Sequence, residues 1–309
     1  MKVRVLGSAA GGGFPQWNCH CRNCAGVREG AIRAQPRTQS SIAVQGTDGF
    51  DASPAWVLVN ASPDILAQLR ANPDLLTAPG ARGAALRSIV LVDGQIDHTT
   101  GLFMLREATR PWPLWCTTSV ARDLTESNPI FKVLGHYCGI EHHTIDTARV
   151  FRVEGAAGIE WRAVPLHSKP APFSPNRAHP EPGDNIGLSL RDGTSGRTLF
   201  YAPGLGSIDA QVWEHMCAAD CVLVDGTFWS EDEMVRLGLS RKLAADMGHL
   251  PQSGAGGMIE WLDRLPTTTR KVLIHINNTN PILDEDSAER RILAEHGIEV
   301  AFDGMEIEL

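Results

Sequence analysis

The sequence lacks any long hydrophobic run: no stretch of the 309 residues approaches the roughly 20 consecutive apolar residues of a membrane-spanning helix. Residues 1–7 also lack an apolar run of signal-peptide length, so we expect a cytoplasmic protein. A basic excess is missing too, because 28 Lys and Arg against 36 Asp and Glu leave a net charge of −8. Unspecific nucleic-acid binding needs a basic face. Neither a membrane nor a nucleic acid is therefore an expected partner.

Cysteine is scarce outside one short cluster. Three of the seven cysteines, Cys19, Cys21 and Cys24, fall within six residues. This density and the odd total suit a reducing compartment with a bound metal better than a disulfide framework. Three thiolates leave a tetrahedral zinc one ligand short, so a residue far away in sequence, His20 or a water molecule has to complete the site. Reactive or incidental cysteines are the alternative. The pattern predicts a structural zinc loop at residues 19–24.

A nucleotide-binding loop is missing as well. The glycine-rich residues 8–15 have neither the GxGxxG spacing nor the Gly-Lys-Ser/Thr ending of such loops. A tight turn beside a pocket is the better interpretation. The sequence also lacks internal repeats and low-complexity linkers, and its 43% hydrophobic and 21% charged residues are typical of a soluble globular protein. We therefore predict a single domain, residues 1–309.

What the sequence does contain is an alternation of apolar runs and helical patterns. The predicted strands are residues 3–6, 41–44, 56–59, 88–92, 159–166, 186–190, 198–201, 221–224, 271–276 and 298–302. The predicted helices are residues 63–70, 101–107, 209–218, 231–237, 254–262 and 287–295. Antiparallel-looking runs mixed with strand–helix alternation predict two sheets with helices outside them, an α/β fold. The proline-rich residues 168–184 are predicted to form a mobile surface loop or lid.

Side chains that bind metals stand at the ends of several apolar runs. They are Asp93, Asp97, His98, His167, Asp225, His249 and His275. Sites in α/β proteins usually form where strand ends meet, so these side chains predict one converging site. The ordinary alternatives are an N-capping aspartate at a strand-to-helix turn and histidines that hydrogen bond to neighbouring loops.

The order of these residues resembles a known superfamily. Asp97-His98 followed by Gly101-Leu102, with the histidines downstream, resembles the metallo-β-lactamase superfamily, whose signature is HxHxDH. The cysteine cluster and residues 166–169 and 302–306 resemble its phosphodiesterase branch. Residues 222–227 and 274–281, and the chain as a whole, resemble the PqqB family of coenzyme PQQ synthesis. The resemblance implies a four-layer αββα sandwich with the active site at the sheet edge.

The chain departs from the superfamily signature at one of its two metal positions. The first two signature histidines are replaced by Asp93 and Gln95, and the carboxylate that normally bridges two metals is missing from residues 201–204. The other position keeps Asp97, His98 and His275. Two imidazoles and a carboxylate with open positions form the ligand set of non-haem Fe(II) oxygenases. A two-metal hydrolase needs cations about 3.5–4 Å apart, so hydrolysis is the weaker interpretation.

The family resemblance implies an Fe(II)- and O2-dependent hydroxylation of the tyrosine ring in the Glu–Tyr cross-linked PQQ precursor. Fe(II) is expected on Asp97, His98 and His275, with Asp93 or Asp225 as a further ligand or as a residue that orients a ligand, and with Zn or Mn as substitutes in vitro. The expected catalytic residues are His249, His167 and Asp225, the histidines because imidazole titrates near neutral pH. Two cations of the predicted lid, Lys169 and Arg177, are candidates to meet substrate carboxylates.

The resemblance also bears on the zinc loop and on partners. It aligns Asn278 with the histidine that completes the zinc site in the phosphodiesterase branch, so Asn278 is the expected fourth ligand beside the three cysteines. The expected partners are the PQQ precursor, PQQ, other proteins of the pathway and a second copy of the chain. Two other functions stay open at this point: a metal-dependent hydrolase, and a carrier of PQQ or its precursor.

Overall fold

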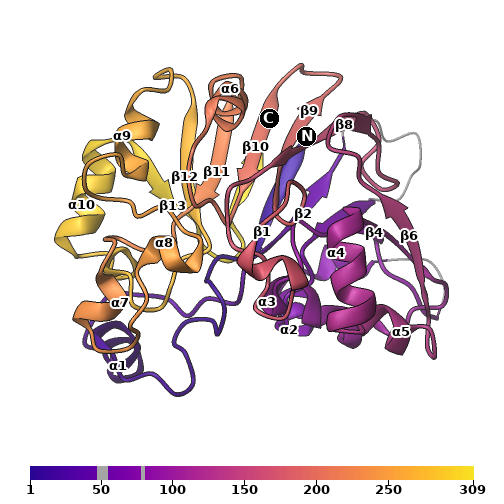
Figure 1. Cartoon of the computed structure of the whole chain (residues 1–309), viewed down its shortest axis with the longest axis horizontal. Coiled ribbons are helices and arrows are strands. Elements are labelled where there is room, and N and C mark those ends of the chain that lie inside the picture. The colour runs from indigo at the N-terminus through magenta and orange to yellow at the C-terminus, as the bar shows by residue number, and fades with distance from the viewer. Residues whose placement is uncertain (47–54, 78–80) are drawn as a thin grey trace.

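Two β-sheets lie face to face, and helices cover both outer surfaces (Figure 1). The computed structural model describes residues 1–46, 55–77 and 81–309. The layers run helices, sheet, sheet, helices, which confirms the expected four-layer sandwich. No helix within the described ranges has the length and apolar character needed to cross a bilayer.

The first sheet has seven strands in the order β14-β1-β2-β3-β4-β5-β6. Its strands are β1 (Lys2–Gly7), β2 (Ser41–Gln45), β3 (Trp56–Val59), β4 (Leu86–Val90), β5 (Trp112–Cys116), β6 (Ile140–Thr144) and β14 (Glu306–Glu308). The pairs from β14 to β3 are antiparallel and those from β3 to β6 are parallel. The helices packed on it are α2 (Ile65–Ala71), α4 (Thr118–Arg122) and α5 (Ile130–Leu134).

The second sheet also has seven strands, in the order β13-β12-β11-β10-β9-β8-β7. Its strands are β7 (Val150–Phe151), β8 (Ile159–Pro165), β9 (Ile186–Asp192), β10 (Thr198–Ala202), β11 (Cys221–Asp225), β12 (Arg270–Ile274) and β13 (Ile298–Val300). The pairs from β10 to β13 are parallel. The helices packed on it are α6 (Ala210–Cys217), α9 (Met258–Asp263) and α10 (Ala288–Glu295).

Strand β11 shows why its sequence is apolar at every position. Cys221 and Leu223 lie in the core between the two sheets, whereas Val222 and Val224 lie in the core under the outer helices. A strand buried on both faces reads as a continuous apolar run. Each fully buried aliphatic side chain contributes about 1.5–3 kcal/mol. The first polar residue after this run, Asp225, therefore arrives at the sheet edge on a rigid strand.

The structure differs from the prediction at residues 108–158, where no element was predicted and β5, β6 and β7 lie, and at the helix predicted at residues 101–107. An α-helix, α3 (Ile96–Thr99), begins earlier and continues as a 3-10 turn over Thr100–Leu105. It begins there because the Asp93 carboxylate accepts the Gln95 N–H at 2.9 Å and turns the chain. The segment then passes close to the backbone of Ala61 and Ser62, since a Cβ at Gly101 would lie 2.1 Å from the Ser62 carbonyl oxygen. Asp97 and His98 are consequently helical residues.

The predicted lid, residues 168–184, contains a 3-10 turn at Pro175–Ala178 and is fastened to α4. Thr117 Oγ1 donates to the Gly183 carbonyl at 2.6 Å, and Arg122 donates to Asn176 Oδ1 at 3.0 Å. These bonds hold the segment as one wall of the cavity described next.

Candidate metal centres

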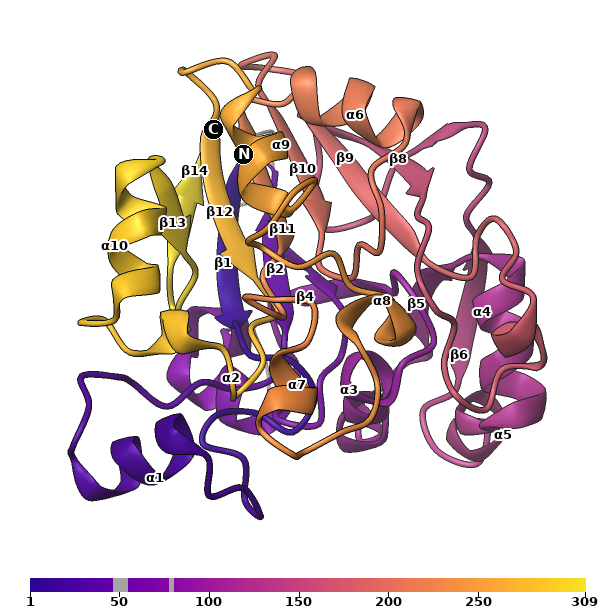
Figure 2. The same ribbon diagram turned by 60° about the vertical axis from the view of Figure 1, so that its left-hand side comes forward.

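The ends of β4, β11 and β12 meet at one edge of the sandwich, where α3, α7 (Glu233–Arg236) and α8 (Ala244–Met247) also lie (Figure 2). A cavity of about 480 Å³ opens there. Residues from all three strand ends line it, including Asp93, Thr227 and His275. The structure thus gathers side chains that are far apart in sequence at one site.

Asp97, His98 and His275 form the first group that can hold a metal ion. One ligand atom from each residue lies within 4.8 Å of the others. His275 Nε2 is 3.2 Å from Asp97 Oδ2, and His98 Nε2 is 3.8 Å from the same oxygen. Burial disfavours the Asp97 carboxylate, but His98 and His275 together outweigh it and hold its pKa below the usual range. The group presents two imidazole nitrogens and an ionised carboxylate.

His98 provides the test of whether a metal fits this group. Its side chain is buried, and Nδ1 is held by Asp93 at 2.8 and 2.9 Å from the two carboxylate oxygens. Its other nitrogen, Nε2, is buried without any hydrogen-bond partner among the described residues. Buried polar atoms are normally paired. A cation bound between Nε2, Asp97 and His275 would satisfy this nitrogen, so the residues fit a metal.

Of its two predicted roles, Asp93 is placed for that of orienting a ligand and not for that of a further ligand. Both of its carboxylate oxygens face His98 Nδ1, and it does not belong to the group whose ligand atoms converge. A carboxylate that accepts the second N–H of a metal-binding histidine fixes the tautomer and raises the basicity of the ligand nitrogen. Burial opposes the charged form of His98, but Asp93 and Asp97 outweigh it and raise the pKa of His98 to about 9. Asp93 therefore orients a ligand.

His275 is fixed by Thr227. The Thr227 hydroxyl donates to Asp225 Oδ1 at 2.6 Å, and it lies 2.9 Å from His275 Nδ1. A hydroxyl that donates to the carboxylate accepts from the imidazole N–H, which leaves the His275 Nε2 lone pair for the cavity. His275 has a positive φ of 61°, an uncommon conformation for a residue other than glycine. The backbone therefore also helps aim this ligand.

Asp225, His249 and His275 form a second group within 4.8 Å. Both oxygens of Asp225 are already occupied: Oδ2 accepts from Leu205 N at 2.8 Å and from His249 Nδ1 at 2.6 Å, and Oδ1 accepts from Thr227. Burial disfavours the carboxylate, but His249 and the other neighbours lower its pKa. The buried Asp225 does not line the cavity, so it orients His249 and Thr227 rather than contacting substrate.

His249 is the candidate base that the structure places beside the metal group. Its ring stacks on His275 with centroids 5.4 Å apart and lines the cavity. Because Nδ1 is committed to Asp225, the nitrogen available to the cavity is Nε2. Burial opposes the imidazolium, but Asp225 outweighs it and raises the pKa of His249.

His167 is not brought into the site. Its side chain is exposed, and its Nε2 is 3.0 Å from Asp209 Oδ2, the N-capping residue of α6. The next two residues, Ser168 and Lys169, do line the cavity. The strand β8 ends at Pro165, and His167 then pairs with Ser207 in an isolated antiparallel bridge. The predicted catalytic role for His167 is therefore dropped.

Gln95 stands at the second histidine of the superfamily signature and makes a hydrogen bond there. Its side-chain amide donates to the Lys169 carbonyl at 3.0 Å, so it fastens a cavity wall. Gly204 lines the cavity near the place of the missing carboxylate. Gln95 and Asp93 therefore make hydrogen bonds at the two positions where the superfamily signature has histidines.

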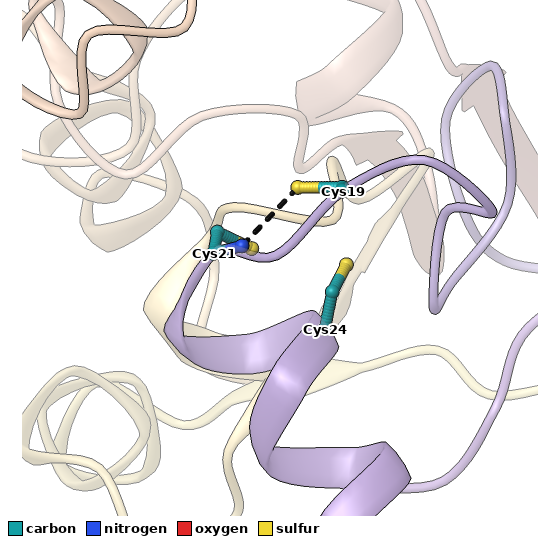
Figure 3. Close-up of side chains that lie close together, drawn as sticks. All are labelled: Cys19, Cys21 and Cys24. Carbon is teal, nitrogen blue, oxygen red and sulfur yellow. Dashed lines mark hydrogen bonds between the residues drawn. The ribbon is translucent and has the colours of Figure 1, made fainter.

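The cysteine cluster forms a separate centre beside α1 (Arg22–Glu29), where the three thiols converge (Figure 3). The sulfurs lie within 4.8 Å of one another. The Asn278 side-chain nitrogen is 3.1, 3.7 and 3.3 Å from the sulfurs of Cys19, Cys21 and Cys24. The alternative ligand His20 is exposed. Asn278 thus occupies the place expected of the fourth ligand.

Among the cavity residues that sequence reasoning did not name as site residues are Thr227, Phe228 and Lys242. Thr227 follows Asp225 at a strand end, and that position was a usable signal. Phe228 packs edge-on against His249 with centroids 5.8 Å apart. Lys242 lies in an irregular segment between α7 and α8, where no sequence pattern distinguishes it from other exposed lysines.

Comparison with known proteins gives consistent matches. The model of the Beta-lactamase superfamily domain matches residues 55–276. Coenzyme PQQ synthesis protein B of Azoarcus sp. (strain BH72) is 62% identical over 309 residues, covering 100% of both chains. The protein of that name in Cupriavidus necator is 59% identical over 308 residues, covering 99% of each chain. Zinc-bound PqqB from Methylobacterium extorquens superposes with a TM-score of 0.90 at 36% identity, over 100% of both chains.

Proposed function

The chain belongs to the coenzyme PQQ synthesis protein B family of the β-lactamase superfamily, and on this premise we propose that it is an Fe(II)- and O2-dependent hydroxylase. The proposed substrate is the Glu–Tyr cross-linked precursor of PQQ, and the reaction hydroxylates its tyrosine ring. As a member of this family, the chain acts in PQQ biosynthesis.

The observation that carries the proposal is the ligand set. Asp97, His98 and His275 converge, and His98 keeps a buried nitrogen free for a cation. Two imidazoles and one carboxylate with open positions suit Fe(II) oxygenases. A two-metal hydrolase would need a second ligand set. At those positions Gln95 instead donates to the Lys169 carbonyl, and Asp93 hydrogen bonds to His98. The chain has kept ligands for one metal of the pair.

The chain's own residues supply positioning and proton transfer. When bound, Fe(II) supplies the activation of O2. His249 Nε2 is the group that accepts the phenol proton, because Asp225 holds its Nδ1 at 2.6 Å and fixes the tautomer. Thr227 holds His275 in the same hydrogen-bonded chain. Phe228 lines the cavity and offers an apolar wall to an aromatic ring.

We also propose that Cys19, Cys21, Cys24 and Asn278 bind a structural zinc. The Asn278 amide faces all three sulfurs. Rotating this amide by half a turn exchanges its nitrogen for its oxygen, and the two atoms are nearly indistinguishable in shape. The oxygen would then complete a tetrahedral set with three thiolates. The site would tie the N-terminal loop to the segment after β12.

The test of the hydroxylase is anaerobic reconstitution with Fe(II), followed by isotopically labelled O2 and a cross-linked Glu–Tyr substrate. Mass spectrometry should find the label on the tyrosine ring. His98→Ala should lose both the iron and the labelled product, because it removes the unpaired ligand nitrogen.

Two other outcomes would contradict the proposal. Absence of oxygen incorporation together with phosphodiester or lactam cleavage under Zn or Mn would identify a hydrolase. Tight binding of PQQ without any metal-dependent turnover would identify a carrier.

A further inference from the structure

Three cationic residues line the cavity that contains the metal group: Lys169, Arg177 and Lys242. Among the described lining residues, the carboxylates are Asp93 and Asp97. Both are engaged with histidines, Asp93 with His98 at 2.8 Å and Asp97 with His275 at 3.2 Å. The three cations therefore make the cavity locally positive, although the net charge of the chain is −8. Charge of one sign in a cleft concentrates ligands of the opposite sign.

The cations come from two segments that lock together beside the metal group. Lys169 and Arg177 lie in residues 168–184, and Lys242 lies just before α8. Ser168 Oγ donates to the Gly248 carbonyl at 2.8 Å. A Cβ at Gly248, whose φ is +91°, would lie 2.6 Å from Lys169 N. This close approach fixes the backbone of one cationic segment against the other.

Gln95 also holds the backbone of the segment that carries Lys169. Its amide donates to the carbonyl of Lys169 at 3.0 Å. It is two residues from Asp97 and lines the same cavity. Gln95, which departs from the metal signature, thus connects the metal group to the cationic wall formed by Lys169, Arg177 and Lys242. Arg177 is held separately, because its side chain donates to the Pro170 carbonyl.

We propose that Lys169, Arg177 and Lys242 bind carboxylate groups of the substrate, and that Gln95 is the positioning residue for Lys169. This inference rests on the proposed function, because it concerns how the same site selects its substrate. Hydrogen bonds between cationic side chains and carboxylates are among the strongest in proteins, and arginine can make two in parallel. With Phe228 as an apolar wall, the cavity selects an aromatic ligand that carries several carboxylates.

The experiment titrates PQQ, an aromatic tricarboxylate, into the intact zinc-loaded protein without O2, using calorimetry. Lys242→Met should raise Kd about tenfold or more, the effect of losing one charge-assisted hydrogen bond. Lys169→Met should act similarly. Arg241→Met is the matched control, because Arg241 is the exposed neighbour of Lys242 and does not line the cavity.

Gln95→Leu tests positioning separately from charge. It should weaken PQQ binding severalfold and leave the metal content, measured by elemental analysis, unchanged. Added salt should weaken binding to the parent protein more steeply than binding to Lys242→Met, because a screened charge contributes less.

Equal Kd values for Lys242→Met, Lys169→Met and Arg241→Met would overturn the proposal. So would a parent affinity that does not respond to salt. Neither result depends on turnover, since the binding is measured without O2. A failure of oxygen incorporation would therefore count against the hydroxylase alone, and normal PQQ binding by the lysine variants would count against the cationic wall alone.

Discussion

At the scale of single residues, His98 illustrates how neighbours prepare a metal ligand. Asp93 occupies its Nδ1 and Asp97 lies 3.8 Å from its Nε2. The imidazole is buried, so its orientation is set by these contacts and by packing rather than by solvent. A ligand held in this way loses little rotamer freedom when the metal binds.

Asp93→Asn should lower metal affinity about tenfold to hundredfold, which is the usual effect of removing a carboxylate behind a metal-binding histidine. The amide keeps the shape but loses the charge that supports His98. Competition with a calibrated chelator measures the affinity. Asp209→Asn is the control, because it removes the carboxylate of an exposed Asp–His pair, that with His167, and asparagine still caps α6. Equal affinities in the two variants would show that Asp93 does not support the ligand.

The residues of this site were predictable to different degrees. Asp97 and His98 were found because they are adjacent polar residues at the end of an apolar run, and His275 and His249 because they end or follow such runs. His167 met the same criterion and still faces solvent, where it pairs with Asp209. Sequence position indicates which edge a side chain reaches, but the local backbone decides where it points.

At the scale of elements, the cysteine loop and α1 form a small unit joined to the segment after β12. Asn23 in α1 donates to the carbonyls of Asn278 and Asn280 at 3.1 and 2.8 Å. Cys24 is fully buried in the first turn of the helix. A zinc ion between the cysteines and Asn278 would add to these bonds, so its removal should loosen the loop without dismantling the sheets.

Cys21→Ser should lose the zinc of this loop and retain the metal bound by His98 and His275. We expect a Tm lower by roughly 4–8 °C, since a loss of about 2 kcal/mol lowers the Tm of a large domain by ~2–4 °C for each kcal/mol. Elemental analysis and calorimetry measure both quantities. Cys217→Ser is the control because Cys217 is exposed on α6. Unchanged zinc content and Tm in Cys21→Ser would refute the structural site.

The strands were easier to predict than the helices for a physical reason. Strands such as β3 and β11 are buried on both faces, so their apolar runs are uninterrupted and flanked by polar residues. The helices α3 and α8 have four residues each, too few to show a helical period, whereas α7 lies within the helix predicted at residues 231–237. Since these short helices surround the cavity, the sequence predicts the scaffold better than the walls of the site.

At the scale of the whole molecule, the chain joins its two halves near the site. After β13 in the second sheet it crosses to the first sheet, where β14 pairs with β1. Asp303 lies at this crossing, and its carboxylate accepts from Ser8 N and Oγ at 2.9 and 2.8 Å and from Thr38 N and Oγ1, both at 2.7 Å. The loop it holds continues to Ala10 and Gly11, which line the cavity.

Asp303→Ala should therefore lower the free energy of unfolding by about 2–4 kcal/mol. The substitution removes the charged acceptor and leaves several hydrogen-bond donors without a partner. The loss stays below the sum of four such bonds, since burial raises the pKa of Asp303 and already makes its carboxylate costly. Urea unfolding followed by circular dichroism measures the change. Glu308→Ala, an exposed carboxylate on β14, should leave stability nearly unchanged. If both variants unfold at the same urea concentration, the crossing does not depend on Asp303, and the loops beside the metal group must be joined by the direct backbone bond between Ala10 N and Ile276 O at 2.9 Å.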